Sequence, residues 1–217
     1  MATVESVVLE VEDPAAAEAF YAAAFGLGDA VVVRPGTAPT SGFRAFTLSL
    51  VVSQPGTVDS LIGSALEAGA TSLKPARKSF WGYGGVVRAP DGTIWKVATS
   101  SKKDSGPATR QVDDIALLLG VADVKASKQF YVAHGLTVAK SFGSKYVEFA
   151  GAPSRITLAL YGRRALAKDA GVAPDGTGSH RIVVTGDAGA FTDPDGFTWE
   201  AASAEVGLSQ GPAGNDQ

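Results

Sequence analysis

The chain contains few residues that can perform acid–base, nucleophilic or metal chemistry. It has two histidines and no cysteine among 217 residues, so thiolate ligands and cysteine nucleophiles are excluded. His180 and Glu200 are the main candidates, because an imidazole beside a carboxylate can transfer protons near neutral pH or ligate a divalent metal. The other histidine, His134, stands directly before Gly135, where we expect it only to stabilise the end of a helix.

A second group of residues is suited to binding an organic molecule. Residues 80–84 read Phe-Trp-Gly-Tyr-Gly, which places three aromatic side chains within four positions. Two interpretations remain open: Phe80, Trp81 and Tyr83 line a pocket for a planar or apolar ligand, or the segment is a packed turn in which Trp81 covers a sheet edge. Lys96 could pair with an anionic ligand, attack a carbonyl group, or form an ion pair within the protein.

Composition limits the remaining classes of function. The net charge of -3 and the lack of a basic stripe argue against nucleic acid as a partner. No apolar run approaches the ~20 residues of a membrane span, and the N-terminus lacks a signal-peptide pattern, so we expect a cytoplasmic protein, monomeric or homodimeric. No phosphate-binding glycine loop and no Gly-x-Ser-x-Gly motif occurs, so nucleotide binding and serine-hydrolase chemistry have no support.

Two halves of the chain repeat one pattern. Ala-Pro-Asp-Gly-Thr-Ile-Trp-Lys at 89–96 matches Asp-Pro-Asp-Gly-Phe-Thr-Trp-Glu at 193–200, and each half also contains an Asp, then Phe-Tyr, then Gly-Leu at similar spacing. This repetition predicts a tandem duplication. The predicted units span 1–100 and 112–204, with a linker at 101–111 and a disordered tail at 205–217.

Hydrophobic periodicity predicts an α+β protein. Helices are expected at 15–25, 57–68, 123–134 and 163–169, and strands at 4–11, 30–34, 43–53, 86–88, 93–99, 112–121, 136–142, 145–150, 155–161, 180–185 and 197–203. Residues 72–82 show no clear pattern. Alternation along the strands points six side chains toward a cavity and packs Trp95 and Trp199 on helices. The six are Lys96, Ala116, Thr157, Ala159, Tyr161 and Glu200.

These features together resemble the vicinal oxygen chelate superfamily, which includes glyoxalase I, bleomycin-resistance proteins and extradiol dioxygenases. The resemblance covers roughly residues 4–203 and rests on the Asp-started helix ending in Phe-Tyr and on the final Asp-Pro-Asp-Gly strand. It implies βαβββ modules that form curved mixed sheets around a cavity. Two modules look shortened, because the usual hairpin has no room between Arg34 and Phe43, nor the usual helix between Thr185 and Phe191.

The resemblance also implies positions for the ligands of one divalent metal. In the first unit these positions hold Ser6 and Lys96, neither of which is a plausible ligand. In the second unit Ala116 and Ala159 occupy two of them. His180 and Glu200 remain, and we expect them to be either two ligands of an incomplete, weak metal site or a hydrogen-bonded pair without metal.

Three functions therefore compete. The first is a bleomycin-resistance-like protein that binds a small aromatic or amphiphilic molecule, without a full metal site and with no cofactor, using Phe80, Trp81, Tyr83, Lys96, Thr157 and Tyr161. The alternative is a glyoxalase-like lyase or isomerase that acts at His180 and Glu200, either with a weakly bound divalent metal or by acid–base chemistry. The third is an accessory protein with no small-molecule role, which a cavity smaller than ~300 Å³ would favour.

Overall fold

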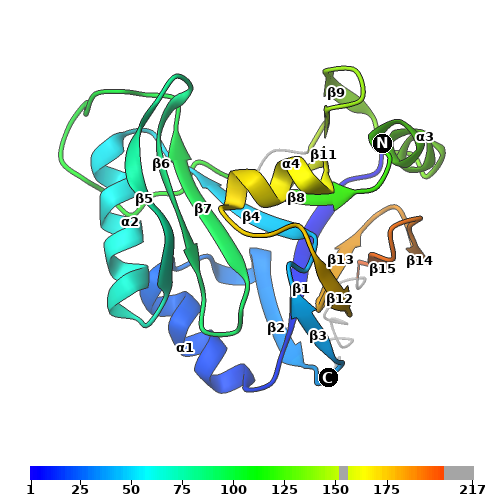
Figure 1. The fold of residues 1–217 in the computed structure, drawn as a ribbon, viewed down its shortest axis with the longest axis horizontal. Helices are drawn as coiled ribbons and strands as arrows, with labels where there is room; N and C mark the ends of the chain where they lie inside the picture. The colour runs from blue at the N-terminus through cyan, green and yellow to red at the C-terminus, as the bar shows by residue number, and fades with distance from the viewer. Residues whose placement is uncertain (152–155, 203–217) are drawn as a thin grey trace, which may run out of the picture.

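The computed structural model describes residues 1–151 and 156–202, and it has two main sheets (Figure 1). The predicted tail at 205–217 lies outside the described residues. The larger sheet has eight strands in the order β5 (Thr71–Ser79), β6 (Gly82–Arg88), β7 (Ile94–Thr99), β4 (Phe46–Val51), β8 (Asp114–Val121), β11 (Thr157–Gly162), β10 (Tyr146–Phe149) and β9 (Val138–Ser141). The smaller has five strands in the order β14 (Phe191–Thr192), β15 (Thr198–Ala201), β13 (Ile182–Gly186), β1 (Val4–Val11) and β2 (Val31–Pro35).

Each half of the larger sheet is a strand, a helix and three further strands. The helix of the first half is α2 (Pro55–Glu67) and that of the second is α3 (Val124–Ala133). The two halves meet where β4 pairs antiparallel with β8. The smaller sheet joins segments from opposite ends of the chain, because β1 pairs antiparallel with β13. The two sheets therefore cross the boundary that the sequence predicts between two units.

The smaller sheet is built from shortened pieces, as predicted. After α1 (Pro14–Ala24) and a short 3-10 turn at Gly28–Ala30, β2 pairs in parallel with β1 and no hairpin intervenes. Between β13 and β14 the chain forms no helix. A separate ribbon of β3 (Thr40–Gly42) and β12 (Gly176–Gly178) bridges the two halves of the sequence.

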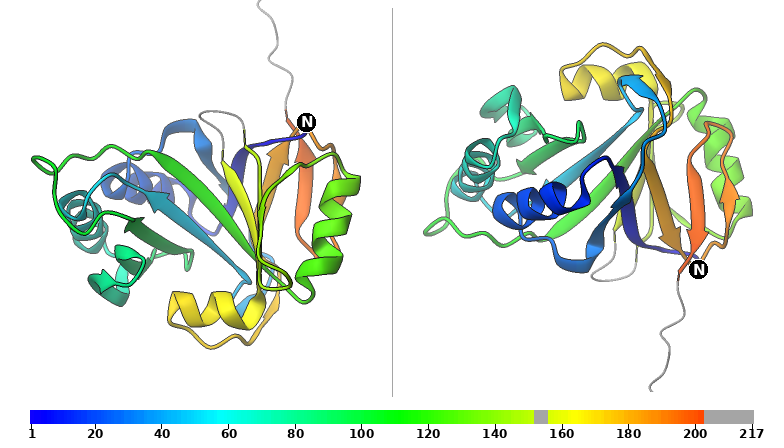
Figure 2. Two further views of the ribbon diagram at one scale, coloured as in Figure 1. Left: turned by 90° about the horizontal axis from the view of Figure 1, so that it is seen from above. Right: turned by 90° about the horizontal axis from the view of Figure 1, so that it is seen from below.

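One hydrophobic core holds the sheets and three helices together. In the views of Figure 2, α1 and α2 lie at one end of the molecule and α3 at the other. Trp95 is buried against Tyr21 of α1 and against Phe25, which directly follows that helix, and Trp199 is buried against Tyr131 of α3, which confirms the predicted packing of both tryptophans on helices. Such aromatic pairs add to the free energy of folding beyond their buried area.

The two repeated phrases, at 89–96 and 193–200, each stabilise a helix at this core through a carboxylate, although Asp91 follows the proline of its phrase and Asp193 precedes the proline of its own. The Tyr21 hydroxyl donates to the Asp91 carboxylate at 2.5 Å, and the Tyr131 hydroxyl donates to Asp193 at 2.7 Å. Burial, followed by the nearby carboxylate, raises the pKa of both tyrosines well above its ordinary value. Each phrase therefore holds one helix against the core, α1 in the first half of the chain and α3 in the second, by satisfying a buried hydroxyl.

Candidate functional site

The eight-stranded sheet carries α4 (Arg163–Ala170) on the face that points away from the main core (Figure 1). Leu166, Ala167 and Ala170 form a small apolar cluster there with Val86 and Ile94. We call this the α4 face. Its central row runs across four strands in register and consists of Lys96, Ser49, Ala116 and Thr157.

Lys96 on the α4 face is held by an ion pair. Its Nζ atom lies 2.8 Å from Oδ2 of Asp169, at the end of α4. The neighbouring Lys74 donates to the carbonyl oxygens of Lys168 and Asp169 at 2.7 and 2.6 Å. The ion pair that we gave as one alternative for Lys96 is therefore confirmed, and cations near a helix C-terminus are favourably placed.

A cavity of about 250 Å³ lies beside Lys96. We call it the Lys96 cavity. Gly82 and Gly84 leave its floor open, and Trp81 lies at its rim. Its charged lining residues are three cations and one carboxylate: Lys74, Arg77, Lys96 and Asp169. Arg77 makes no side-chain hydrogen bond or ion pair with any residue that the structure describes, so this cation is available to a ligand.

The predicted aromatic residues divide between two sides of the sheet. Phe80 and Trp81 stand at the tip of the β5–β6 hairpin, 81% and 83% exposed, so they are neither packed in a turn nor enclosed in a pocket. Tyr83 faces the helices instead, because its hydroxyl donates to Asp59 of α2 at 2.8 Å. Tyr83 nevertheless borders the Lys96 cavity together with Gly82 and Gly84, which the alternation of β6 turns to the α4 face.

Thr157 and Tyr161 lie on the α4 face as predicted, but far from Lys96. Thr157 is three strands away in the central row, about 14 Å at the usual strand spacing. Its hydroxyl donates to Asp114 at 3.1 Å. Tyr161 packs against Tyr146 with ring centroids 4.9 Å apart. The six predicted ligand-binding residues therefore do not form one pocket, although three of them, Trp81, Tyr83 and Lys96, border the Lys96 cavity.

His180 is held between two loops by both ring nitrogens. Nδ1 lies 2.7 Å from the carbonyl oxygen of Arg44, and Nε2 lies 3.0 Å from that of Asp195. The ring stacks on Phe197 at 4.0 Å. Since both partners are acceptors, both hydrogen bonds form together only when the imidazole carries two protons. In this position neither nitrogen is available to a metal or a substrate.

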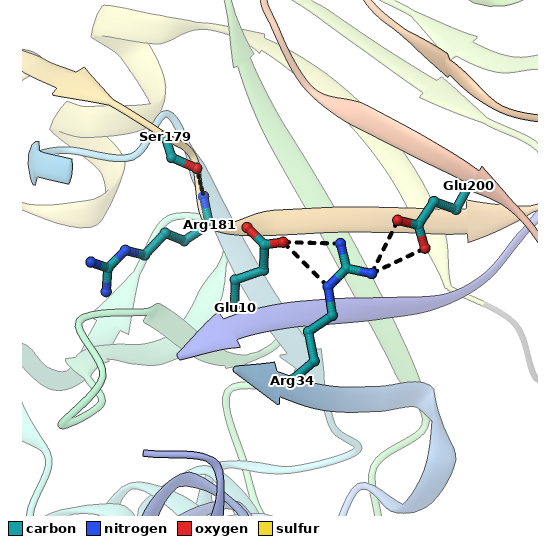
Figure 3. A network of polar contacts seen from close by, with 5 residues as sticks. All are labelled: Glu10, Arg34, Ser179, Arg181 and Glu200. Carbon is teal, nitrogen blue, oxygen red and sulfur yellow. Dashed lines mark hydrogen bonds and ion pairs between the residues drawn. The ribbon is translucent and has the colours of Figure 1, made fainter. Parts of the chain in front are cut away.

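Glu200 belongs to a different network, drawn in Figure 3. Arg34 donates from Nη1 to both carboxylate oxygens of Glu200, at 3.0 and 3.2 Å, and from Nη2 to Glu10 at 2.9 Å. Burial lowers the pKa of Arg34, but the hydrogen bonds to Glu10 and Glu200 outweigh it and raise the pKa overall. Sequence reasoning missed Arg34 and Glu10, although Glu10 shares a face of its strand with Ser6 by alternation.

The predicted pairing of His180 with Glu200 is wrong. Glu200 pairs in register with Thr185, and Thr185 pairs with Ser6 on the neighbouring strand. Thr185 is five residues beyond His180, which corresponds to about 16 Å along an extended chain. A polar cavity of about 380 Å³ is lined by His180, Arg34 and Glu10, and Glu200 is not among its lining residues.

The residues at the implied metal positions do not fit a metal site. The row on the α4 face offers Lys96, Ser49, Ala116 and Thr157, and the row on the smaller sheet offers Ser6, Thr185 and Glu200, whose carboxylate is bound to Arg34. Within residues 1–151 and 156–202, no group of three or more His, Asp or Glu side chains could hold an ion. A catalytic divalent metal usually needs about three protein ligands.

Comparison with known proteins supports the fold. No protein-family model matches the sequence, and none of the curated proteins matches it. The structure is similar to that of glyoxalase I from Zea mays, with a TM-score of 0.61, 13% identity and coverage of 93% of this chain and 92% of that one. The chain shares the fold of glyoxalase I.

A second similar structure has the same fold and a different described activity. It is a putative dioxygenase from Bacillus subtilis, with a TM-score of 0.52, 12% identity and coverage of 89% of this chain and 71% of that one. At this level of identity the likeness extends to the fold alone, because the vicinal oxygen chelate fold carries several chemistries. None of the described helices is long and apolar enough to cross a membrane.

Proposed function

We propose that this protein binds a small planar organic anion in the Lys96 cavity, without a metal. The observation that carries the proposal is the charge around that cavity, where Lys74, Arg77 and Lys96 face a single carboxylate, Asp169. Lys96 is paired with Asp169, and Lys74 donates to main-chain carbonyls, so the two positive charges in excess belong to Lys74 and Arg77. Of these two, Arg77 is the one without a side-chain partner among the described residues. A carboxylate matches the planar, bidentate donor geometry of a guanidinium.

The rim of the cavity favours an aromatic body for the anion. Trp81 borders the cavity and exposes most of its ring, and a planar ligand could stack on it while its carboxylate meets Arg77. Gly82 and Gly84 place no side chain over the floor. The volume of about 250 Å³ lies below the ~300–1,000 Å³ of drug-sized pockets, which taken alone favours the accessory protein with no small-molecule role. The charge at Arg77 and the exposed ring of Trp81 favour a ligand instead, and the volume limits that ligand to about one substituted ring.

Binding is favoured over catalysis by the state of the two predicted catalytic residues. His180 uses both ring nitrogens in bonds to main-chain carbonyls, and Glu200 is neutralised by Arg34. A general base must reach the proton that it removes, which neither group can do without first breaking these contacts. Lyase or isomerase activity at His180 and Glu200 remains the alternative prediction.

Tryptophan fluorescence offers a direct test. Of the three tryptophans, Trp95 and Trp199 are buried, so Trp81 is the exposed reporter beside the cavity. We expect benzoate and salicylate to quench its emission saturably, and Arg77→Gln to weaken binding about tenfold. Lys78→Gln removes an exposed cation from the same strand outside the cavity lining and should leave binding unchanged.

The same samples also test whether binding requires a metal and whether the chain holds one. We expect binding to be unaffected by EDTA, and elemental analysis after dialysis against Zn²⁺, Ni²⁺, Mn²⁺ or Fe²⁺ to give much less than one equivalent per chain. Equal weakening by Arg77→Gln and Lys78→Gln would reject the Lys96 cavity as the site. About one equivalent of metal that disappears in a His180→Ala, Glu200→Ala double variant would favour the enzyme alternative.

A further inference from the structure

The turn between β5 and β6 carries the two most exposed large apolar side chains that the structure describes. It is a two-residue turn, because Ser79 pairs with Gly82 and only Phe80 and Trp81 lie between them. Their side chains are 81% and 83% exposed. Tight turns usually hold Gly, Asn, Asp or Ser, which suit both the backbone and the solvent. A pair of large aromatic side chains at such a turn therefore marks an interaction surface.

The shape of this turn does not depend on burying either ring. The Trp81 amide donates a hydrogen bond to Oγ of Ser79 at 3.2 Å. The rings of Phe80 and Trp81 contact each other edge to face, with centroids 5.0 Å apart and planes at 88°. In Figure 1 the β5–β6 hairpin extends to the upper left of the molecule, and the chain that follows β7 starts beside it. We call Phe80 and Trp81 the hairpin tip.

Basic side chains surround the hairpin tip. Lys78 lies on β5 next to the turn, and Lys102, shortly after β7, places its Nζ atom 5.8 Å from the centroid of the Phe80 ring. Arg77 and Lys103 adjoin these two lysines in the sequence. All four cations are exposed, and none forms an ion pair with a residue that the structure describes. The hairpin tip is therefore an apolar point within a ring of positive charge.

Three carboxylates lie near this end of the sheet, and they do not cancel the positive charge. They are Asp59, Asp104 and Asp169. With Lys74 and Lys96 included, six cations stand against these three carboxylates, although the chain as a whole has a net charge of -3. Asp113 and Asp114 also lie at this end, but at the start of β8, three strands from β6. That separation is about 14 Å at the usual strand spacing, which exceeds the Debye length of about 8 Å in physiological salt.

The geometry of the tip favours a lipid bilayer over single-stranded nucleic acid. Proteins that stack bases present flat aromatic faces along a charged groove. The two rings here stand at 88° to each other, so they do not offer parallel faces to successive bases, and they project from a turn. Aromatic side chains next to lysines suit the boundary between headgroups and acyl chains, where the rings insert and the cations attract anionic headgroups.

We propose that the hairpin tip attaches this protein to the surface of a bilayer that contains anionic lipids. Phe80 and Trp81 insert at the boundary between headgroups and acyl chains, and Lys78, Lys102 and Lys103 contact the lipid phosphates. Each such lysine strengthens the attachment about fivefold near an anionic surface. The attachment is peripheral and needs no spanning helix. Of its five residues only Trp81 also borders the Lys96 cavity, so the proposal stands whether or not that cavity binds an anion.

Co-sedimentation of the full chain with vesicles tests the proposal. One set of vesicles contains phosphatidylcholine with about 30% phosphatidylglycerol, and the other contains phosphatidylcholine alone; we expect binding to the anionic set to be about tenfold stronger or more. The emission of Trp81 should shift to shorter wavelength on binding, because Trp95 and Trp199 are buried already. Brominated acyl chains should quench the same emission, which places the ring at the lipid.

Phe80→Ser should weaken binding to the anionic vesicles about tenfold or more, because it removes half of the inserted apolar surface. Phe142→Ser is the matched control. Phe142 is 65% exposed near another turn, between β9 and β10, and its loss should leave vesicle binding unchanged.

A second pair of variants tests the charge. Lys102→Gln combined with Lys103→Gln should weaken vesicle binding about 25-fold, at fivefold for each lysine. Lys125→Gln combined with Lys145→Gln removes two exposed lysines from the second half of the chain and should have little effect. All four positions are exposed, so circular dichroism should show a folded protein in each case.

Equal binding to both sets of vesicles, or equal weakening by Phe80→Ser and Phe142→Ser, would overturn the proposal. Displacement from the vesicles by an oligothymidylate would assign the surface to nucleic acid. Self-association that Phe80→Ser abolishes, without vesicle binding, would assign it to a second copy of the chain.

Benzoate titration of the same variants separates this surface from the Lys96 cavity. Phe80, Lys102 and Lys103 do not line that cavity, so these variants should lose vesicle binding and keep the affinity for benzoate of the unmodified chain. Parallel loss of both would show a general change in the hairpin and reject these side chains as membrane contacts. Failure of the unmodified chain to bind benzoate would reject the proposed function alone, because the vesicle measurements do not depend on it.

Discussion

His180→Phe distinguishes a structural histidine from a catalytic one. Phenylalanine keeps the planar ring and its stacking on Phe197, and it removes both hydrogen bonds to main-chain carbonyls. Those bonds connect the Arg44 segment before β4 to the Asp195 turn before β15. The substitution should therefore loosen the attachment between the two sheets.

The size of the effect follows from the two bonds. A net contribution of about 1 kcal/mol for each gives about 2 kcal/mol of destabilisation when the imidazole carries both protons, since both carbonyls then lose a donor in a partly buried site. For a chain of this length, that corresponds to a fall in Tm of roughly 4–8 °C. Urea unfolding followed by circular dichroism gives the free energy of unfolding directly.

His134→Phe is the matched control. His134 is also a histidine stacked on a phenylalanine, but it bonds only the carbonyl of Phe130 within its own helix, at 2.9 Å. We expect its substitution to cost about half as much as His180→Phe, because one hydrogen bond is lost instead of two. Unchanged stability of His180→Phe, or a larger loss in His134→Phe, would refute the assignment of His180 as a structural clamp.

Three further substitutions test other parts of the structure. Tyr131→Phe removes the donor to Asp193 and the acceptor for Nε1 of Trp199, so the free energy of unfolding should fall by about 2 kcal/mol in urea titrations. Burial raises the pKa of Asp114 in the folded protein, and the charge of Glu148 raises it further. Hydrogen bonds from Thr157 and from the Ile115 amide lower this pKa and offset part of the rise. The folded state therefore holds this proton more strongly than the unfolded state, and stability falls as pH rises from the ordinary Asp pKa through the folded pKa. Asp114→Asn should remove that loss, so urea midpoints should show it more stable than the unmodified chain at pH 7 and show the advantage shrinking toward pH 4. Gly42→Ala should weaken the β3–β12 ribbon, because φ is 67° and an added Cβ would lie 2.3 Å from the carbonyl oxygen of Asp175; hydrogen exchange at the amide of Phe43, which donates to that carbonyl, should accelerate.

The sequence predicts most elements because their burial is one-sided. Strand 4–11 alternates buried and half-buried residues, and helix 57–68 buries residues at helical spacing, so both follow from periodicity. Strand β5 was missed for a physical reason. It is an edge strand that is largely exposed, contains Pro75 and pairs with shifts in register, so no alternation marks it.

The candidate site was harder to predict because it depends on register and on contacts between distant residues. Spacing placed His180 on a strand, but Arg181 adopts a φ of 53°, and β13 begins only at Ile182. Alternation cannot be extended backward through that break. The ion pair of Lys96 with Asp169 joins residues on β7 and α4, and the Arg34–Glu200 pair joins opposite ends of the chain. Neither pairing leaves a local pattern in the sequence.

The two sheets reach a similar electrostatic arrangement with opposite charges. On the α4 face a cation, Lys96, is neutralised by Asp169, and on the smaller sheet an anion, Glu200, is neutralised by Arg34. A dication bound to Glu200 would have to displace Arg34, which is also paired with Glu10. The ion would gain Glu200 as a ligand, and the protein would lose both ion pairs of Arg34. Arg34→Met would remove that competitor and leave Glu10 and Glu200 facing each other. Metal affinity should therefore rise in Arg34→Met if the arginine is what occupies this position, and calorimetry with Mn²⁺ would measure it; equal, negligible heats in both proteins would show that these two carboxylates cannot hold a metal even when free.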